Sequence, residues 1–424
     1  MRFAQAVIGA NYGDEGKGLV VDYLVSRAPD QADTIVVRAN GGAQAGHTVR
    51  HGSKQHTFHH FGSGTFLGVR TFLSNHFVVN PMLFWKEKKQ LDQLNVRVAP
   101  LFIDPRAVIT TPWDIMANQA RERVAPLGSC GVGVRDTMER NEHSLHGLTV
   151  GEVVGLFSTN PLCLYSKLEA IRDVWLPEYL IENRVPADLI ETESRIAVTE
   201  RFFNDLRDFT NAVTLITPGS LHKNGYEHFI FENSQGLGLD QNYGTVPNVT
   251  RSNTGLKNIL EVCKEAEIDG LEVYYTTRAY LTRHGIGYME SEITQADLVD
   301  AWKGHQTMAH VLKQAATDAN VENEFQGKMR FGYLDALSLQ ARIKRDLQQA
   351  RTWNEFYPNI KVIPQLAVTC LDHLDLKGNY FIASKLEGCE KDRFAKQLAR
   401  EIGLTNVLES WGPTRDTVKE GLVL

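Results

Sequence analysis

A glycine-rich stretch near the start of the chain, residues 10–18, places two acids and a lysine within one short loop. It reads Ala-Asn-Tyr-Gly-Asp-Glu-Gly-Lys-Gly and contains Asp14, Glu15 and Lys17. Glycines let a backbone approach phosphates, but two carboxylates would repel a ligand of the same charge. This conflict favours a catalytic loop in which a carboxylate lies beside a phosphate and Lys17 neutralises charge. The alternative is an ordinary polar turn that carries a surface ion pair.

The segments on either side of this loop predict the elements that hold it. Residues 4–8 are typical of a buried strand, and residues 19–24 are typical of the first turns of a helix. A helix that begins after such a loop offers unpaired N–H groups and the positive end of its dipole to an anion. The spacing differs from the usual phosphate-binding loop, because no Ser or Thr follows Lys17.

Three later loops are also rich in glycine and polar residues. Residues 39–49 include His47, which could donate a proton or a hydrogen bond to a phosphate oxygen, although a loop histidine is more often a surface residue. Residues 127–136 contain Gly-x-Gly but have Asp136 where a dinucleotide-binding loop needs a third glycine, which argues against that class. Residues 232–254 carry many amides, hydroxyls and glycines, which suits a small polar ligand; a long surface loop is the plainer interpretation.

The repeated order of apolar segment, polar loop and helical segment predicts an α/β fold. We expect a large, mostly parallel central sheet with helices on both faces and with ligand loops at the carboxyl ends of its strands. We expect one domain, residues 1–424, with a helical insertion at about residues 112–215. Strands are predicted at residues 34–38, 77–79, 98–103, 107–110, 229–231, 273–281 and 366–371, and helices at residues 81–91 and 112–124.

Composition and charge argue against several classes of protein. The 424 residues carry a net charge of −6, which disfavours a general nucleic-acid binder. No apolar stretch is long enough to span a bilayer, and residues 1–4 lead directly into a predicted strand, so we expect neither a membrane segment nor a signal peptide. The five cysteines are scattered without metal-ligand spacing, which favours reduced thiols and a cytoplasmic location.

These loops, in this order, resemble those of the adenylosuccinate synthetase family across nearly the whole chain. The residues that carry the resemblance are Gly13-Asp14-Glu15-Gly16-Lys17-Gly18, Asn40-Gly41-Gly42, Ala45-Gly46-His47-Thr48, Gln235-Gly236, Gly244-Thr245, Thr250, Ser252-Asn253-Thr254, Gly412-Pro413 and Arg415. Each motif is weak by itself, but their common order makes a specific signal. The resemblance implies a fold related to that of the P-loop NTPases.

The resemblance implies an enzyme that joins L-aspartate to the 6-position of inosine monophosphate (IMP), using GTP and magnesium (Mg). Asp14 would be the general base that removes the N1 proton of the purine, and the 6-oxygen would then attack the γ-phosphate. His47 and Lys17 would stabilise the transferring phosphoryl group. Magnesium would be held by the Asp14 carboxylate and the Gly46 carbonyl, which are the hard oxygen ligands that it prefers.

The same resemblance assigns residues to each ligand. The purine nucleotide would be bound by Asn40, Ser129, Arg140, Gln235 and Thr250. The triphosphate would be bound by Gly16, Lys17, Gly18, Thr48, Asp372, Ser410, Gly412 and Pro413, and aspartate by Lys328 and Arg330. We expect a homodimer, because the family lends a basic residue across its dimer interface to the neighbouring subunit's nucleotide. Arg140 is the first candidate for that residue, and Arg135 is the second.

Several positions depart from the pattern of the family. The aspartate-binding loop, residues 326–335, is shorter and less basic than is usual in the family. Cys370 replaces the lysine that would pack against the guanine base, although Asp372 can still accept hydrogen bonds from guanine N1–H and its amino group. Gln44 replaces an asparagine. These departures predict a relative whose substrate has shifted.

Three functions follow from these observations. One is the reaction on IMP. The second is the same chemistry on deoxyguanylate (dGMP), which one branch of the family uses, with ATP as the alternative donor; the presence of Asp14 favours IMP over dGMP. The third is a nucleotide-binding regulator without catalytic activity, which the intact Asp14, Lys17 and His47 disfavour.

Overall fold

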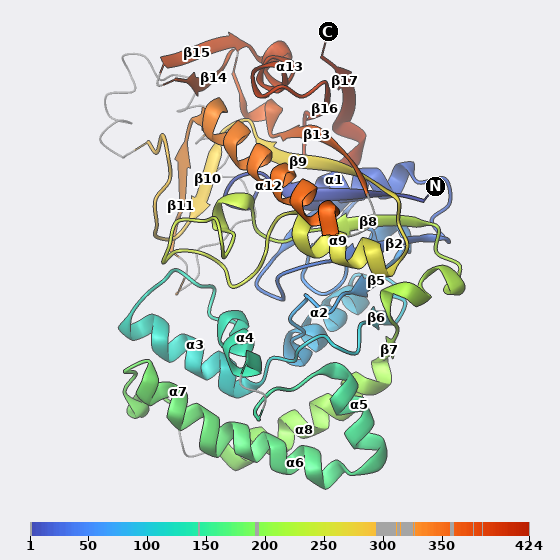
Figure 1. The fold of residues 1–424 in the computed structure, drawn as a ribbon, viewed down its shortest axis with the longest axis vertical. Coiled ribbons are helices and arrows are strands. Elements are labelled where there is room, and N and C mark those ends of the chain that lie inside the picture. Colours follow the sequence, from blue (N-terminus) through green and yellow to red (C-terminus); the bar gives the residue numbers. More distant parts are fainter. Residues whose placement is uncertain are drawn as a thin grey trace.

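The computed structural model describes residues 2–142, 145–190, 195–293, 327–356, 360–375, 377–383 and 385–423, and the single residues Val311, Gln314 and Phe325. In this part of the chain, ten strands form one sheet in the order β17-β16-β13-β9-β1-β8-β2-β5-β6-β7 (Figure 1). They are β1 (Phe3–Gly9), β2 (Thr34–Arg38), β5 (Arg70–Leu73), β6 (Leu101–Ile103), β7 (Val213–Leu215), β8 (His228–Glu232), β9 (Gly270–Arg278), β13 (Lys361–Thr369), β16 (Asn406–Ser410) and β17 (Val418–Leu422). All neighbouring strands are parallel except β16 and β17, so the expected α/β fold with a large, mostly parallel sheet is confirmed.

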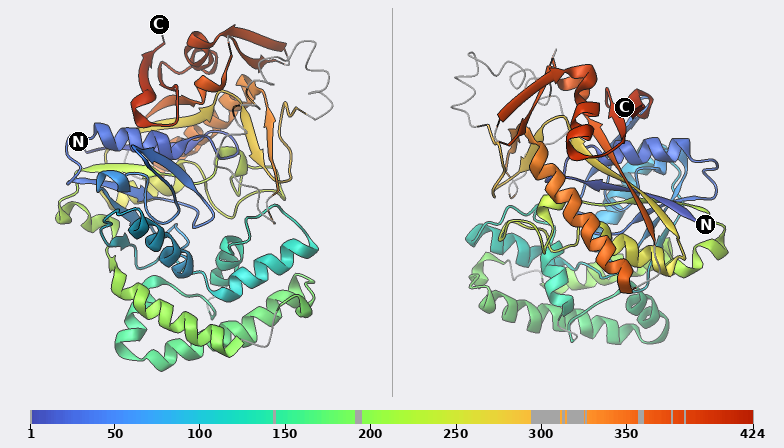
Figure 2. Two further views of the ribbon diagram at one scale, coloured as in Figure 1. Left: turned by 180° about the vertical axis from the view of Figure 1, so that it is seen from behind. Right: turned by 45° about the horizontal axis from the view of Figure 1, so that its top comes forward.

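Helices cover both faces of this sheet because side chains of its central strands alternate between two cores. In β1, Ala6 and Ile8 belong to the core that includes residues of α9 (Leu256–Glu265), α12 (Ala336–Phe356) and α13 (Lys391–Ile402). Val7 lies on the other face, in the core that includes residues of α1 (Lys17–Arg27). Figure 2 shows α1 and α12 on opposite sides of the sheet. A parallel sheet buried on both faces needs strands that are apolar throughout, which is why these runs were recognisable in the sequence.

A mainly helical layer lies beyond the β7 end of the sheet (Figure 1). It contains α3 (Pro112–Val124), α4 (Val134–Glu142), α5 (Val150–Thr159), α6 (Pro161–Ala170), α7 (Leu176–Glu182) and α8 (Arg195–Ala212), while α2 (Pro81–Gln93) lies closer to the sheet. Helix α3 begins where it was predicted, because Thr111 and Asp114 form a reciprocal capping box and Pro112 is the first helical residue. Most of the described residues between 112 and 215 are helical.

Two short segments that the apolar pattern predicts as strands, residues 77–79 and 107–110, do not form ladders. They are joined to their neighbours by isolated bridges, such as that between Val79 and Ile109. Both residues are fully buried in the core beside α2 and α3. Their apolar character therefore reflects burial in irregular backbone, which periodicity does not distinguish from a buried strand.

Smaller sheets flank the central one. The hairpin β3 (His47–His51) and β4 (Lys54–Phe58) follows β2, and β10 (Leu281–His284) pairs with β11 (Met329–Gly332) after β9 has ended at Arg278. A third small sheet contains β12 (Leu334–Asp335), β14 (Lys377–Ile382) and β15 (Lys385–Glu390). None of the described helices has the length and apolar character needed to cross a membrane.

The strand order brings the carboxyl ends of six strands together. Strands β16, β13, β9, β1, β8 and β2 are consecutive neighbours, and five of them run in the same direction as β1. The segments that follow β1, β2, β8, β13 and β16 carry residues that the sequence motifs single out. Ligands in open parallel sheets bind outside the carboxyl ends of the strands, so this edge is where a site is expected.

Candidate active site

A cavity of about 680 Å³ lies where these loops meet, and its volume suits a small-molecule site. Of the predicted site residues, it is lined by Asp14, Gly16, Lys17, Gly18, Gly46, His47, Thr48, Ser129, Gln235, Thr250, Asp372, Gly412 and Pro413. The fold therefore brings together side chains from the loops after β1, β2, β8, β13 and β16 and from the loop between α3 and α4.

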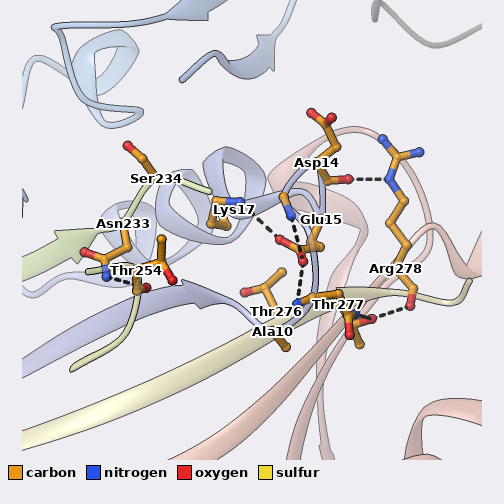
Figure 3. A network of polar contacts seen from close by, with 12 residues as sticks. Ala10, Asp14, Glu15, Lys17, Asn233, Ser234, Thr254, Thr276, Thr277 and Arg278 are labelled. Carbon is orange, nitrogen blue, oxygen red and sulfur yellow. Dashed lines mark hydrogen bonds and ion pairs between the residues drawn. The ribbon is translucent and has the colours of Figure 1, made fainter. Parts of the chain in front are cut away.

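The two acids of the first loop have different environments. Glu15 is buried, and its carboxylate accepts hydrogen bonds from the backbone N–H groups of Asn11 and Gly13 and lies 3.2 Å from Lys17 Nζ. Figure 3 shows the Asp14 side chain pointing away from Glu15. Both acids line the cavity, but Glu15 is committed to holding the loop and orienting Lys17, and Asp14 is the more exposed of the two. The pairing of Glu15 with Lys17 reduces the repulsion that its carboxylate would exert on a phosphate.

Asp14 is held by contacts to its backbone and to its side chain. Its φ is 56°, a left-handed conformation that Asp tolerates better than most residues, and its carbonyl oxygen accepts a hydrogen bond from Arg278 Nε. Its Oδ2 lies 3.0 Å from Nε2 of His284. Burial by itself would raise the pKa of Asp14, but His284, Arg278 and Lys17 outweigh this effect and lower it. Asp14 is thus an ionised carboxylate at neutral pH.

His47 forms a second histidine–carboxylate pair. Its Nδ1 lies 2.5 Å from Oε1 of Glu232, the fully buried last residue of β8, which also accepts a hydrogen bond from the backbone N–H of Ser63. Burial lowers the pKa of His47 to about 4, although Glu232 opposes this effect. The ring is therefore neutral at pH 7, and the carboxylate favours the tautomer with its proton on Nδ1. Nε2 is then the nitrogen left for a ligand.

The loop after α3 is fixed by a side chain of that helix. Oε2 of Glu122 accepts hydrogen bonds from the backbone N–H groups of Leu127, Gly128 and Ser129 at 2.9, 3.0 and 3.3 Å. Asn118, one turn earlier on α3, is hydrogen-bonded to the Ser129 hydroxyl. Ser129 therefore reaches the cavity on a loop of defined conformation, as its predicted role requires.

Arg140 does not have the position that its predicted role requires. It is fully buried and pairs with Asp114 at 2.8 Å, and it also donates to the carbonyl oxygens of Ile109 and His146. A side chain with its donors committed to the interior is not available to a neighbouring subunit, so this prediction is corrected. The rival candidate, Arg135, lines the cavity and makes only a partly exposed ion pair with Glu139 among the described contacts.

Asn40 and Ser410 support the site without lining the cavity. The Asn40 amide is buried, accepts from Ser234 N at 2.7 Å and donates to the carbonyl oxygens of Ser234 and Asn253. It therefore ties the loop after β2 to the loop after β8. The Ser410 hydroxyl donates to the carbonyl oxygen of Gly412 at 2.9 Å and shapes the turn after β16. In this structure both residues hold ligand loops rather than contact the cavity, contrary to expectation.

The residues predicted to bind aspartate also lie outside the cavity lining. Lys328 is exposed, and Arg330 of β11 is paired with Glu292 and donates to the carbonyl oxygen of Gly287. Of the predicted aspartate loop, residues 326–335, Gln326 lies outside the described residues. Two basic side chains from β9 and β10, Arg278 and Arg283, do line the cavity.

Several lining or supporting residues were not assigned a role from the sequence. They are Glu122, Glu232, Arg278, Arg283 and His284. The signal for Glu232 and Arg278 was present, because each is a charged residue that ends an apolar strand next to a polar loop. His284 had no such signal, since it ends a short strand outside the central sheet.

The fold and the cavity are those of an α/β enzyme whose ligand loops follow parallel strands. A family model described as adenylosuccinate synthetase matches residues 6–351. The adenylosuccinate synthetase of Nitratidesulfovibrio vulgaris is 29% identical over 349 residues, which cover 80% of this chain and 74% of that protein. That of Clostridium botulinum strain 657 is 32% identical over 316 residues, 71% of this chain and 68% of that protein. The chain belongs to the adenylosuccinate synthetase family, whose members are ligases that form C–N bonds in purine biosynthesis.

Two solved structures share the fold over almost the whole chain. The adenylosuccinate synthetase of Plasmodium falciparum, solved fully ligated, superposes with a TM-score of 0.69 at 18% identity and covers 98% of this chain and 99% of its own. The succinoaminodeoxyadenylate synthetase of cyanophage S-2L, solved with dGMP and with dATP as an energy donor, has a TM-score of 0.59 at 15% identity, with coverages of 99% and 95%. At these identities the likeness concerns the fold.

Proposed function

We propose that this protein is a purine-nucleotide:aspartate ligase that converts IMP, GTP and L-aspartate into adenylosuccinate, GDP and phosphate. The observation that carries the proposal is that Asp14, Lys17 and His47 line one cavity. The first two come from the segment after β1, and His47 comes from the segment after β2. A carboxylate, an ammonium group and a neutral imidazole are the groups that proton abstraction followed by phosphoryl transfer requires.

In the first step, Asp14 removes the N1 proton of IMP, and the 6-oxygen forms a bond to the γ-phosphorus of GTP. The bond between that phosphorus and the β-phosphate oxygen breaks, and GDP leaves. The lowered pKa of Asp14 keeps it ionised and able to accept a proton. Its position at the tip of the first loop supports this role, because the same loop leads into α1, whose N-terminus favours phosphate.

His47 and Lys17 act on the phosphoryl group during this transfer. Lys17 is the first residue of α1 and carries its charge at the helix N-terminus, where phosphate oxygens are favoured. His47 offers Nε2 to a phosphate oxygen, and the dianionic ligand raises the proton affinity of the ring while Glu232 stabilises the resulting positive charge. The contact therefore strengthens as charge develops.

In the second step, the amine of aspartate attacks C6, the phosphate leaves, and the amine loses its proton. A 6-phosphoryl group is a far better leaving group than hydroxide, which is why the first step must precede the second. Arg278 and Arg283 line the same cavity and support binding of an anionic substrate there. Lys328 and Arg330 are proposed to assist at the rim of this region.

Asp14 and Gly46 are proposed to hold magnesium, and their chemistry fits this ion. Both offer hard oxygen atoms to the same cavity, and Gly46 is exposed. Magnesium is commonly bound by one or two protein oxygens together with substrate phosphates. When bound, it would neutralise charge on the phosphates that Lys17 and His47 also contact.

The second candidate is the same chemistry on dGMP, with ATP as donor. Cys370 lines the cavity in place of a lysine, beside Asp372, so the donor base loses a packing partner that the family normally supplies. The cyanophage enzyme, which shares the fold, was solved with dGMP and dATP. Asp14 still favours IMP, because a smaller residue there would leave more room for the 2-amino group of guanine.

An aspartate-dependent phosphate-release assay that crosses IMP, GMP and dGMP with GTP and ATP tests the proposal. We expect the highest kcat/KM with IMP and GTP, and no release without aspartate. Highest activity with dGMP would establish the second candidate instead. Nucleotide binding without aspartate-dependent release from any combination would leave the regulator as the function.

A further inference from the structure

The contact between Asp14 and His284 joins two parts of the chain that are distant in sequence. His284 is the last residue of β10, and its Nε2 lies 3.0 Å from Oδ2 of Asp14 in the loop after β1. The side chain of His284 is 13% exposed and that of Asp14 is 29% exposed. The pair is therefore sheltered but open to the cavity that both residues line.

The contact involves one oxygen of the carboxylate. Among the described residues, no hydrogen bond ends on Oδ1 of Asp14, while Oδ2 is taken by His284. The backbone of Asp14 is fixed separately, by the hydrogen bond from Arg278 to its carbonyl oxygen. With its backbone and one side-chain oxygen both held, Asp14 presents a single oxygen in a defined direction.

We infer that His284 is a positioning residue that fixes the Asp14 side chain so that Oδ1 faces the purine and the magnesium ion. The inference rests on the proposed function, in which Asp14 is both the base and a magnesium ligand. Without His284, the carboxylate rotates about its side-chain bonds, and fewer encounters place Oδ1 on the N1 proton. A small loss of orientation costs a large factor in rate.

The same contact connects the base to the region proposed to bind aspartate. His284 pairs with Met329 in the β10–β11 register, and Arg330 is the next residue of β11. Gly285, which follows His284, donates its backbone N–H to the carbonyl oxygen of Lys328. His284 therefore links Asp14 to strand β11, which contains Arg330 and directly follows Lys328.

Two variants of His284 test the inference. His284→Leu removes the hydrogen bond, whereas His284→Gln places an amide N–H close to the position of Nε2. For His284→Leu we expect kcat to fall about ten- to hundredfold with little change in the KM of the nucleotides. His284→Gln should recover most of that loss, because it restores the hydrogen bond without the ring.

A measurement that does not depend on turnover uses Mn²⁺ as a paramagnetic probe of the metal site. Binding is followed by electron paramagnetic resonance in the presence of IMP and a GTP analogue that is not hydrolysed. We expect His284→Leu to weaken Mn²⁺ binding about tenfold or more and His284→Gln to weaken it much less. Both variants are measured below their melting temperatures, which circular dichroism gives.

His76 supplies a matched control. Its Nε2 lies 3.0 Å from Oε2 of Glu261, with side chains 19% and 36% exposed, and it does not line the cavity. His76→Leu removes a histidine–carboxylate contact of the same length and should leave kcat and Mn²⁺ binding unchanged.

The inference fails if His284→Leu keeps wild-type kcat and Mn²⁺ affinity, or if His284→Gln loses as much as His284→Leu. It also fails if the loss appears in the KM of the nucleotides alone, because His284 would then be a binding residue. Failure of the proposed function would instead appear in the wild-type protein, as absence of aspartate-dependent phosphate release.

Discussion

Nδ1 of His47 donates its hydrogen bond to Glu232, a buried carboxylate that lies 185 positions later in the chain at the end of a neighbouring strand. The pair orients the ring and supplies a negative charge that stabilises it once it becomes protonated. A ligand phosphate beside Nε2 would also stabilise the protonated ring, because it adds a second negative charge. The His47 ring is therefore neutral without a ligand, and a bound phosphate would raise its pKa and favour protonation.

Replacing His47 with Asn should lower kcat about 10²–10⁴-fold with little change in KM, because the contact strengthens as charge develops on the transferring phosphoryl group. Steady-state kinetics of phosphate release with IMP and GTP measure both constants. A loss that appears mainly as a higher KM would make His47 a plain binding residue.

Asp14→Asn should abolish turnover, because it removes the proposed base and weakens the proposed metal site. Loss of a general base typically costs about 10²–10⁴-fold. Nucleotide binding, measured by isothermal titration calorimetry, should largely survive, since Lys17 and the helix N-terminus are unchanged. Turnover above about a tenth of the wild-type value would contradict the assignment of Asp14 as base.

Asp372→Asn should reduce the preference for GTP over ATP. An ionised carboxylate accepts hydrogen bonds from guanine N1–H and its amino group and opposes adenine, whose N1 is an acceptor. Asp372 lines the cavity, and a hydrogen bond to a charged group contributes about 1.5–3 kcal/mol, so wild-type kcat/KM should favour GTP by roughly tenfold to a hundredfold. Competition between GTP and ATP in the release assay measures the preference. Wild-type protein that uses ATP equally well would exclude the guanine role of Asp372.

Arg140→Met should destabilise the protein rather than weaken nucleotide binding by a neighbouring subunit. The change leaves Asp114 as a buried carboxylate without its cation, a loss on the order of 3–5 kcal/mol. Chemical unfolding measures this difference. Arg135→Ala breaks an exposed ion pair, should cost less than about 1 kcal/mol, and should raise the KM of the purine nucleotide if this side chain reaches it. Equal stability of the two variants would contradict the interior position of Arg140.

Asp346 should make the folded state more stable at mildly acidic pH. Burial raises its pKa from 3.8 to about 6, even though Leu256 N and the Tyr275 hydroxyl donate to it. The folded protein then binds more protons than the unfolded chain between these values, so stability falls as pH rises through this window and is level above it. From pH 5 to pH 7 this group should cost about 1 kcal/mol.

The Asp346→Asn variant tests this pH dependence, because it keeps an acceptor for Leu256 N and has no proton to lose. Unfolding by guanidinium chloride at pH 5, 6 and 7 should show that the wild-type protein loses more stability than the variant over this range. Parallel profiles for the two proteins would mean that Asp346 does not titrate there.

The sequence pattern was sufficient to predict the sheet and the loops at its carboxyl ends, because strands buried on both faces are apolar and the polar loops interrupt them sharply. It was not sufficient to pair Asp14 with His284, since that contact depends on where the antiparallel pair of β10 and β11 lies. Arg140 was misplaced for another reason. The buried face of α4 includes Asp136, Thr137 and Arg140, and a helix whose inner face is polar gives no amphipathic signal to show which arginine is inside.

The central position of β1 separates two groups of loops that have different proposed ligands. On one flank, the loops after β13 and β16 carry Asp372, Gly412 and Pro413, which are proposed to meet the triphosphate donor. On the other flank, the loop after β8 carries Gln235 and Thr250, which are proposed to meet the purine nucleotide. If these assignments hold, a substitution at Cys370 changes the proposed donor side of the cavity and leaves the proposed acceptor side, with Asp14, as it is. Substrate preference in this lineage can evolve one nucleotide at a time.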